Sequence, residues 1–206
     1  MTRKRHWDGI HFEKEPRDLT WYQETPTVTM QMLELAGATP QSPLIDVGGG
    51  AARLVDHLIA NGYENLTVLD ISSVALDQSR RRLGQAAERV QWIVADVLEA
   101  ELPRAYELWH DRAVFHFLTN PDERRRYASK LYDALTPGGH AIITTFAEDG
   151  PEKCSGLPCA RYSPKALHAE LGAERFRLLD SARETHMTPR GQEQRFQCSL
   201  LQKVPG

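Results

Sequence analysis

The feature that most constrains how this chain of 206 residues folds is a short apolar run that ends in three glycines. Residues 43–50 read PLIDVGGG, a pattern typical of a buried strand that enters a tight turn. Segments with helical periodicity then alternate with further apolar runs as far as residue 146. This alternation predicts a parallel sheet with helices on both faces, and right-handed crossovers make such a sheet doubly wound.

The two ends of the chain differ from this alternating pattern. Apolar positions recur at helical spacing over 26–38, whereas residues 1–25 are polar with interleaved aromatics and match no regular period. After a helix predicted over 163–171, two β-rich runs (175–186 and 192–204) follow with no helix between them. Consecutive strands of this kind predict an antiparallel hairpin at one edge of the sheet.

Composition excludes several classes of protein. The chain has 25 Lys and Arg against 28 Asp and Glu, a net charge of −3, which argues against nucleic-acid binding by a broad basic surface. Its three cysteines are too few for a disulfide scaffold and favour a reducing cytoplasm. No apolar run reaches the ~18 residues of a membrane helix, and the first residues lack the apolar stretch of a signal peptide. We therefore expect one cytoplasmic domain over 1–206, with no nucleic-acid or membrane partner.

The glycine turn indicates a ligand site at the edge of the sheet. Asp46 precedes the three glycines, and Gly48 and Gly50 allow the backbone to turn sharply and approach a ligand closely. Ligands of open parallel sheets bind beyond the carboxyl ends of the strands, where this turn lies. A glycine turn can also connect a strand to a helix without binding anything, so the turn alone is a weak indicator.

Acidic residues end the next two predicted strands as well. Asp70 follows Gly50 by 20 residues, a spacing that suits a carboxylate accepting the hydroxyls of a ribose. An N-cap of the following helix is the alternative role for Asp70, although Ser72 fits that role equally. Asp96 and Val97 place a polar group beside an apolar one, which suits the edge of an adenine. Acids at three neighbouring strand ends are more specific than any one of them.

The glycine turn lacks the residues that dinucleotides and nucleoside triphosphates require, and this absence decides among the adenosine ligands. A dinucleotide-binding turn has a third glycine at the position that Arg53 occupies here, and no Gly-Lys-Ser/Thr follows as in a Walker loop. S-adenosylmethionine has a ribose and an adenine but no phosphate, so Asp46 does not repel it. Its amino group pairs instead with a carboxylate. The pattern therefore favours S-adenosylmethionine.

Five segments resemble, in order and spacing, the successive motifs of the class I S-adenosylmethionine-dependent methyltransferases. They are 44–54 (LIDVGGGAARL), 66–72 (LTVLDIS), 94–97 (VADV), 108–118 (LWHDRAVFHFL) and 135–146 (LTPGGHAIITTF). The chain departs from the pattern at Ala52, where many members have a glycine. The resemblance implies a Rossmann-like, mostly parallel seven-stranded sheet whose last strand is antiparallel. The cofactor-binding residues that it implies, together with the reasoning above, are Asp46, Gly48, Gly50, Asp70, Ile71, Asp96 and Val97.

The first residues extend this resemblance. Residues 6–12 (HWDGIHF) and 21–26 (WYQETP) are similar to the start of thiopurine and tellurite-resistance methyltransferases, and of lysine methyltransferases that modify elongation factor 1A or citrate synthase. The resemblance implies that residues 1–38 form an N-terminal lid and helix over the cofactor. Trp21 and Tyr22 then bind the cofactor, because aromatic faces attract a sulfonium cation and a cover excludes water. The same two side chains could instead dock the segment to the core.

Candidate catalytic residues follow the fourth predicted strand. Methyl transfer depends mainly on alignment, and a base is needed only when the nucleophile arrives protonated. His110 and Asp111 end the strand, His116 follows six residues after His110, and a histidine can accept a proton near neutral pH. We expect these three residues to be catalytic. The alternatives are a packed histidine at His116 and a cofactor-holding role for His110 and Asp111.

Two cysteines lie in the loop over 147–162. Cys154 and Cys159 are five residues apart, and a thiol pair can hold a soft metal or metalloid. No third ligand lies nearby and the spacing is not that of a zinc site. We therefore expect no metal and interpret the loop as a cover for the substrate.

These features predict a methyltransferase that uses S-adenosylmethionine and acts on a small molecule, with a thiol or another soft nucleophile as the acceptor. The short chain leaves little room for a protein-docking module. Protein lysine methylation is the main rival function, so a protein substrate is possible. Two further functions fit the same pattern less well, namely a cofactor-binding partner without catalysis and a nicotinamide-dependent reductase.

Overall fold

The computed structural model describes residues 2–204 and contains a seven-stranded sheet in the order β3-β2-β1-β4-β5-β9-β8. Its strands are β1 (Leu44–Val47), β2 (Leu66–Asp70), β3 (Val90–Val94), β4 (Tyr106–Arg112), β5 (Leu135–Phe146), β8 (Phe176–Met187) and β9 (Glu193–Lys203). Strands β1 to β5 are parallel to one another, whereas β9 is antiparallel to both β5 and β8. The predicted fold class, including the antiparallel C-terminal hairpin, is confirmed.

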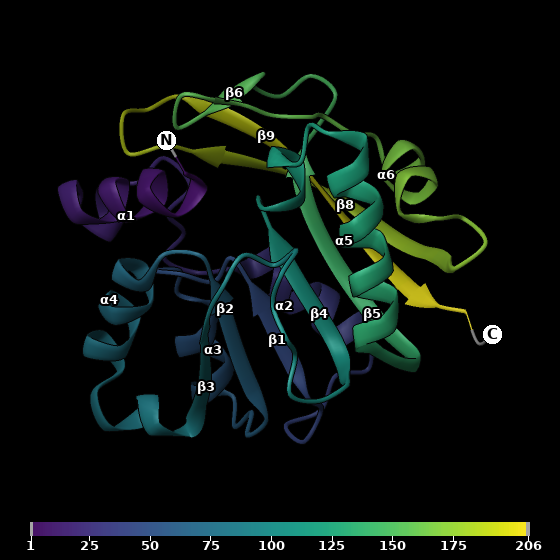
Figure 1. The fold of residues 1–206 in the computed structure, drawn as a ribbon, viewed down its shortest axis with the longest axis horizontal. Helices are drawn as coiled ribbons and strands as arrows, with labels where there is room; N and C mark the ends of the chain where they lie inside the picture. The colour runs from purple at the N-terminus through teal and green to yellow at the C-terminus, as the bar shows by residue number, and fades with distance from the viewer. Residues whose placement is uncertain (1, 205–206) are drawn as a thin grey trace.

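Helices cover both faces of this sheet (Figure 1). They are α1 (Arg3–Glu13), α2 (Thr27–Leu35), α3 (Leu54–Ala60), α4 (Ser73–Leu83), α5 (Pro121–Ala134) and α6 (Pro164–Leu171), with short 3₁₀ turns at Pro16–Asp18, Gly84–Arg89 and Phe115–Phe117. One apolar cluster joins the sheet to α5 and α6, and a second joins the opposite face to α2, α3 and α4. No helix within residues 2–204 is long and apolar enough to cross a membrane.

Side chains along β4 point alternately to the two faces of the sheet, and this alternation sets the face on which each of its polar residues lies. Trp109 packs in the cluster on the α5 side, whereas Leu108 packs in the cluster on the α2 side. Successive side chains of a strand point to opposite faces, so His110 and Arg112 share the α2 side. Asp111 lies between them in sequence and therefore points to the α5 side.

Helix α1 is the element that differs from the sequence expectation, because the sequence predicts no regular period over residues 1–25. Its Thr2 side chain caps the helix by accepting from the Arg5 N–H at 3.3 Å. The helix docks on α4, where the Ser72 hydroxyl donates to Asp8 at 2.8 Å and the Gln78 amide donates to the His11 carbonyl at 2.8 Å. Only one residue of α1 is buried, so its amphipathic signal is weak.

Asp111 holds together the turn after β4. Its buried carboxylate accepts the Val114 N–H at 2.9 Å, the Phe115 N–H at 3.1 Å and the hydroxyl of Tyr127 from α5. The Tyr127 oxygen in turn accepts the Trp109 indole N–H at 2.9 Å. Burial raises the pKa of Asp111 to about 6. This network occupies the carboxylate on the α5 side of the sheet.

The Asp111 network predicts a stability effect. Replacing Tyr127 by phenylalanine leaves the buried Trp109 N–H without its acceptor and Asp111 without a donor, so the free energy of unfolding should fall by about 1–3 kcal/mol. Urea unfolding of the variant measures this loss. The matched control is Tyr132→Phe, a half-buried tyrosine on the same helix. Equal losses in the two variants would contradict the role assigned to the network.

Candidate active site

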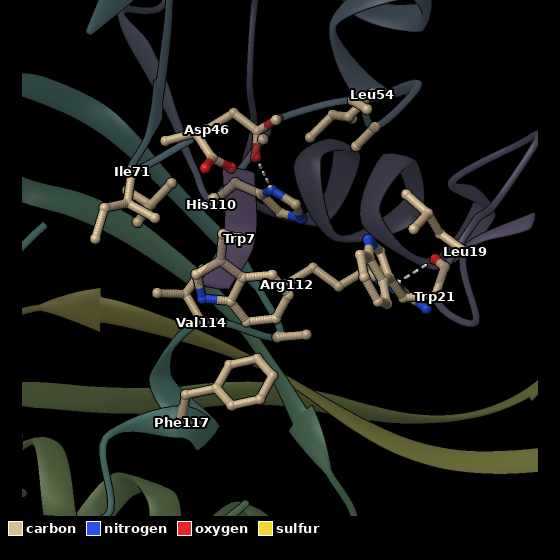
Figure 2. Close-up of a pocket in the computed structure, with 18 of the residues that line it drawn as sticks. Trp7, Leu19, Trp21, Asp46, Leu54, Ile71, His110, Arg112, Val114 and Phe117 are labelled. Carbon is tan, nitrogen blue, oxygen red and sulfur yellow. Dashed lines mark hydrogen bonds and ion pairs between the residues drawn. The ribbon is translucent and has the colours of Figure 1, made fainter. Parts of the chain in front are cut away.

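A pocket lies at the carboxyl ends of β1, β2 and β4 and is closed on one side by the N-terminal segment (Figure 2). The predicted site residues that line it are Trp21, Tyr22, Asp46, Gly48, Gly50, Asp70, Ile71, Asp96, Val97, His110 and His116. Asp111 is not part of the lining, because strand alternation directs it to the opposite face. Its position does not fit the catalytic role expected from the sequence.

The glycine turn packs tightly against two carboxylates. Gly48 and Gly50 adopt positive φ values of 71° and 33°, which favour glycine. A Cβ on Gly49 would lie 2.4 Å from a carboxylate oxygen of Asp46, and one on Gly50 would lie 2.7 Å from a carboxylate oxygen of Asp70. The turn therefore has no space for side chains, and its backbone forms the floor of the pocket.

A chain of hydrogen bonds fixes the carboxylate of Asp46. His110 faces Asp46 in the parallel pairing of β1 and β4, and its Nδ1–H donates to Asp46 Oδ1 at 2.7 Å. The other ring nitrogen, Nε2, is 3.1 Å from the hydroxyl of Thr29 on α2. Both nitrogens of His110 are thus engaged. The geometry suits a residue that orients Asp46, and the catalytic role expected for His110 remains a prediction.

Asp70 ends β2 and carries an unusual protonation equilibrium. Burial raises its pKa to about 7, and the nearby charge of Asp46 adds to this effect. One oxygen, Oδ1, accepts the Ser72 N–H at 2.7 Å, while Ser72 itself caps α4 by accepting the Ala75 N–H at 3.2 Å. Because Ser72 takes the capping role, the second oxygen of Asp70 remains beside the glycine turn.

Asp96 and its neighbours form the far end of the pocket. Asp96 Oδ1 accepts the Leu98 N–H at 2.9 Å, and Oδ2 lies 3.6 Å from the guanidinium of Arg3 on α1. Ile71 and Val97 line the pocket beside these polar groups. This end therefore combines a carboxylate with apolar side chains, as expected for an adenine-binding edge.

Aromatic side chains of the N-terminal segment cover the middle of the pocket. The Trp7 ring packs edge-on against Trp21 and Phe117, with ring centroids 5.8 and 5.1 Å away, and the His11 ring lies 6.1 Å from Trp21. Sequence reasoning missed Trp7 and His11 because it did not predict α1. A signal was present, since Arg3, Trp7 and His11 recur every four residues and all three line the pocket.

His116 is fully buried in the pocket wall and differs from the expected base. Its Nδ1 lies 3.4 Å from the Phe146 N–H and accepts from it, so Nε2 carries the ring hydrogen. Burial, together with the smaller effect of the Arg112 charge, lowers the pKa of His116 to about 3. A histidine with this pKa does not accept a proton near neutral pH. What it offers the pocket is a neutral N–H donor.

Arg112 is a pocket residue that sequence reasoning missed. It extends toward Trp21 (Figure 2), and one guanidinium nitrogen, Nη1, donates to the Trp21 carbonyl at 3.0 Å. Its guanidinium carbon lies 4.5 Å from the ring centroid of Phe196. The signal for Arg112 was its place two residues after His110, which puts both on one face of β4.

The loop over 147–162 contributes one cysteine to the pocket. A small hairpin, β6 (Lys153–Cys154) with β7 (Leu157–Pro158), places the buried Cys154 in the lining, and Cys159 packs in the same apolar cluster. Burial raises the pKa of the Cys154 thiol. No group of three or more metal-ligating side chains occurs within residues 2–204.

Comparison with known proteins finds methyltransferases among the similar sequences and folds. Residues 45–141 match the family model described as a methyltransferase domain. Nodulation protein S of Rhizobium tropici is 31% identical over 114 residues, which cover 55% of this chain and 47% of that protein. EEF1A lysine methyltransferase 2 of Danio rerio is 23% identical over 161 residues, which cover 69% of this chain and 67% of that protein. The chain thus spans about half the length of the first of these relatives.

A solved structure shows the same fold over nearly the whole chain. The N-methyltransferase NodS from Bradyrhizobium japonicum WM9, in complex with S-adenosyl-L-homocysteine, has a TM-score of 0.73 and 15% identity. The match covers 96% of this chain and 98% of that chain. The matched domain, the order of the sequence motifs and the shared fold support the resemblance to the class I S-adenosylmethionine-dependent methyltransferases that the sequence indicated.

Proposed function

We propose that this protein transfers a methyl group from S-adenosylmethionine to a small molecule, with a thiol or another soft nucleophile as the acceptor atom. One observation carries the proposal. The carboxylates of Asp46, Asp70 and Asp96, each at the end of a different strand or just after it, line one pocket beside the glycine turn. Three carboxylates repel phosphates and attract amino and hydroxyl groups, which S-adenosylmethionine has.

The residues of the pocket fit this cofactor. Asp70 faces the glycine turn and offers a carboxylate oxygen to ribose hydroxyls, and Asp46 offers its carboxylate to the amino group. Asp96 accepts from the adenine amine, with Ile71 and Val97 against the ring. When bound, S-adenosylmethionine supplies an electrophilic methyl group on a sulfonium. The protein holds the cofactor and directs the methyl group toward the remaining part of the pocket.

The N-terminal segment acts as the lid over this site. Trp7 and Trp21 line the pocket from one side and pack edge-on against each other. Aromatic faces near a sulfonium attract its charge, and a covered pocket excludes the water that competes with the acceptor. Tyr22 lines the pocket beside them, and its hydroxyl donates to Glu24, which fixes the end of the segment.

The histidines of the pocket favour an acceptor that needs no enzymatic base. Burial lowers the pKa of His116 to about 3 and that of His11 to about 4, and His110 is engaged by two partners. His116 and His11 therefore do not accept a proton near neutral pH, and both ring nitrogens of His110 already have partners. A thiol ionises in water with a pKa of about 8.5 and reaches the site as a nucleophilic thiolate. Amines and hydroxyls that need deprotonation in the site are therefore less suited.

Protein lysine methylation is the second candidate, because the likeness to EEF1A lysine methyltransferase 2 extends over 69% of this chain. Incubation with radiolabelled S-adenosylmethionine separates the candidates, using a panel of small thiols in one arm and a dialysed cell lysate in the other. We expect label in the small thiols. Label on protein bands supports the second candidate, and S-adenosylhomocysteine binding without transfer in either arm supports a non-catalytic partner. Binding of NADH instead supports a reductase.

The raised pKa of Asp70 predicts a pH-dependent cofactor affinity. Ribose hydroxyls donate to the ionised carboxylate, so binding must deprotonate Asp70 when the pH is below about 7. Calorimetry of S-adenosylhomocysteine binding should show affinity falling between pH 8 and 6, with a limiting slope of about tenfold per pH unit. The variant Asp70→Asn should bind about 1–3 kcal/mol more weakly at pH 8 and lose this slope. An unchanged slope in the variant assigns the dependence to another group.

Asp70 also predicts an opposite effect on the ligand-free protein. Its pKa is 3.8 in the unfolded reference and about 7 when folded, so the folded state binds more protons between these values. The contribution of Asp70 to the free energy of unfolding therefore falls as the pH rises through this window and is least favourable above pH 7. In urea unfolding without cofactor, Asp70→Asn should be more stable than wild type at pH 8 and should lose that advantage at pH 4.

The lid role of Trp21 predicts a separation of activity from stability. Trp21→Ala removes an aromatic face from the pocket, so turnover with the best thiol should fall at least about tenfold while the free energy of unfolding changes by less than about 2 kcal/mol. Phe12→Ala is the control, because Phe12 lies on the same segment and is 83% exposed. Loss of stability in proportion to loss of turnover would assign Trp21 to docking alone.

A further inference from the structure

The guanidinium of Arg112 is buried in the pocket wall with part of its hydrogen-bonding capacity unused. Nη1 donates to the Trp21 carbonyl at 3.0 Å, but Nε and Nη2 have no hydrogen-bond partner among residues 2–204. The nearest carboxylate oxygen, on Glu184, lies 3.7 Å from Nη2, which is beyond hydrogen-bond range. Burying charged donors without hydrogen-bond partners is costly, so these two nitrogens are available to an acceptor from outside the chain.

The two unpartnered nitrogens are the ones that form the side-on edge of a guanidinium. The hydrogen on Nε and one hydrogen on Nη2 point in the same direction, and this pair matches the two oxygens of a carboxylate. Nη1, on the other side, is already bound to the lid. The arrangement is that of a carboxylate-binding fork held in place by the Trp21 backbone.

His116 supplies a second unused donor in the same wall. Its Nε2 is buried and has no hydrogen-bond partner within residues 2–204, and it carries the ring hydrogen because Nδ1 accepts from Phe146. Arg112 lies close enough for its charge to lower the pKa of His116, and both side chains line the pocket. Donors on Arg112 and His116 that have no hydrogen-bond partner among residues 2–204 therefore face the same end of the pocket, and both suit an anionic group.

The charges around the pocket support the same conclusion. The other arginines of the lining each lie near two carboxylates, since Arg3 contacts Glu123 and Asp96, and Arg53 lies 3.5 Å from Asp56 and 3.6 Å from Glu24. Glu184 compensates Arg112 only in part, because its other oxygen accepts from the Gln23 amide.

His186 packs near Arg112 but burial lowers its pKa, and its Nε2 is bound to the Thr20 carbonyl at 2.8 Å. Among the described lining arginines, Arg112 is the one with two unpartnered guanidinium nitrogens, Nε and Nη2, whereas Arg53 has one, Nε.

The position of Arg112 sets where the anion lies relative to the cofactor. Arg112 is two residues beyond His110 on the same face of β4, about 7 Å farther along the strand toward its carboxyl end. The guanidinium carbon lies 4.5 Å from the ring centroid of Phe196, and the neighbouring His116 ring packs at a tilt against Phe146 with centroids 4.7 Å apart. An acceptor held here has a flat apolar body between the Asp46 side of the pocket and the guanidinium.

We infer that the methyl acceptor is a small carboxylic acid with a flat apolar body, whose carboxylate binds the Nε–Nη2 edge of Arg112 and the Nε2–H of His116. The inference rests on the proposed function, since it assigns the acceptor of that same site. Arg112 is then a specificity-determining residue, and the nucleophile lies at the opposite end of the acceptor from the carboxylate.

The test compares an acid with its uncharged analogue. Protein saturated with S-adenosylhomocysteine is titrated with benzoate and with benzamide, and we expect benzoate to bind at least about tenfold more tightly. Arg112→Gln should abolish this preference, and Arg112→Lys should retain part of it because the charge remains without the fork. Glu184→Gln should strengthen benzoate binding, because it removes the negative charge beside Arg112. The control Arg183→Gln changes an exposed arginine next to Glu184 in sequence and should leave the preference unchanged.

A second arm uses the reaction itself. Wild-type kcat/KM for 4-mercaptobenzoate, whose thiol lies opposite its carboxylate, should exceed that for thiophenol at least about tenfold, with the difference lost in Arg112→Gln. The inference is overturned by equal affinities for benzoate and benzamide, by no benzoate binding at millimolar concentrations, or by a preference that survives in Arg112→Gln. If that variant does not fold, a Glu184→Gln protein with unchanged benzoate affinity overturns it. Failure of the wild type to bind S-adenosylhomocysteine defeats the proposed function instead, so the two failures are distinguishable.

Discussion

The hydrogen bond between Asp46 and His110 is the interaction on which the organisation of the site depends. It joins the ends of two central parallel strands at 2.7 Å, and the contact of His110 with Thr29 extends it to α2. The glycine turn can then pass directly over the fixed carboxylate, because it carries no side chains that would collide with it. Binding groups at this edge are therefore positioned by the sheet and not by mobile loops.

The concentration of carboxylates at this edge has an energetic cost. Burial raises the pKa of Asp70 to about 7, and the charge of the nearby Asp46 is a smaller contribution in the same direction. Functional sites commonly retain such unfavourable arrangements because a ligand relieves them. A ligand with hydroxyl donors and a positive charge relieves this one, which links the electrostatics of the pocket to the kind of cofactor we propose.

The sequence predicted the sheet well because its signals are local and strong. Apolar runs, glycine turns and helical periodicity all predicted the same alternation of strands and helices. The acids of the site were found because each lies at the end of a predicted strand or just after it. Position alone could not show that His110 lines the pocket and Asp111 does not. That distinction depends on which face of the sheet each side chain of β4 points to. Helix α1 was missed because its ordered face, with Trp7 and His11, borders the pocket and not the main core. A period-four search that accepts aromatic and charged residues together would have found it.

The contact between Arg112 and the Trp21 carbonyl also bears on the order of events in a catalytic cycle. The same guanidinium touches the backbone of the cover and borders the part of the pocket assigned to the acceptor. A ligand that fixes the Arg112 side chain also stabilises the N-terminal lid, because Arg112 binds the Trp21 carbonyl. Since such coupling is reciprocal, the closed lid in turn favours binding of that ligand. If the acceptor binds Arg112 as we propose, its binding and the closing of the N-terminal segment favour each other, so departure of the product would also favour opening of the site for exchange of the spent cofactor.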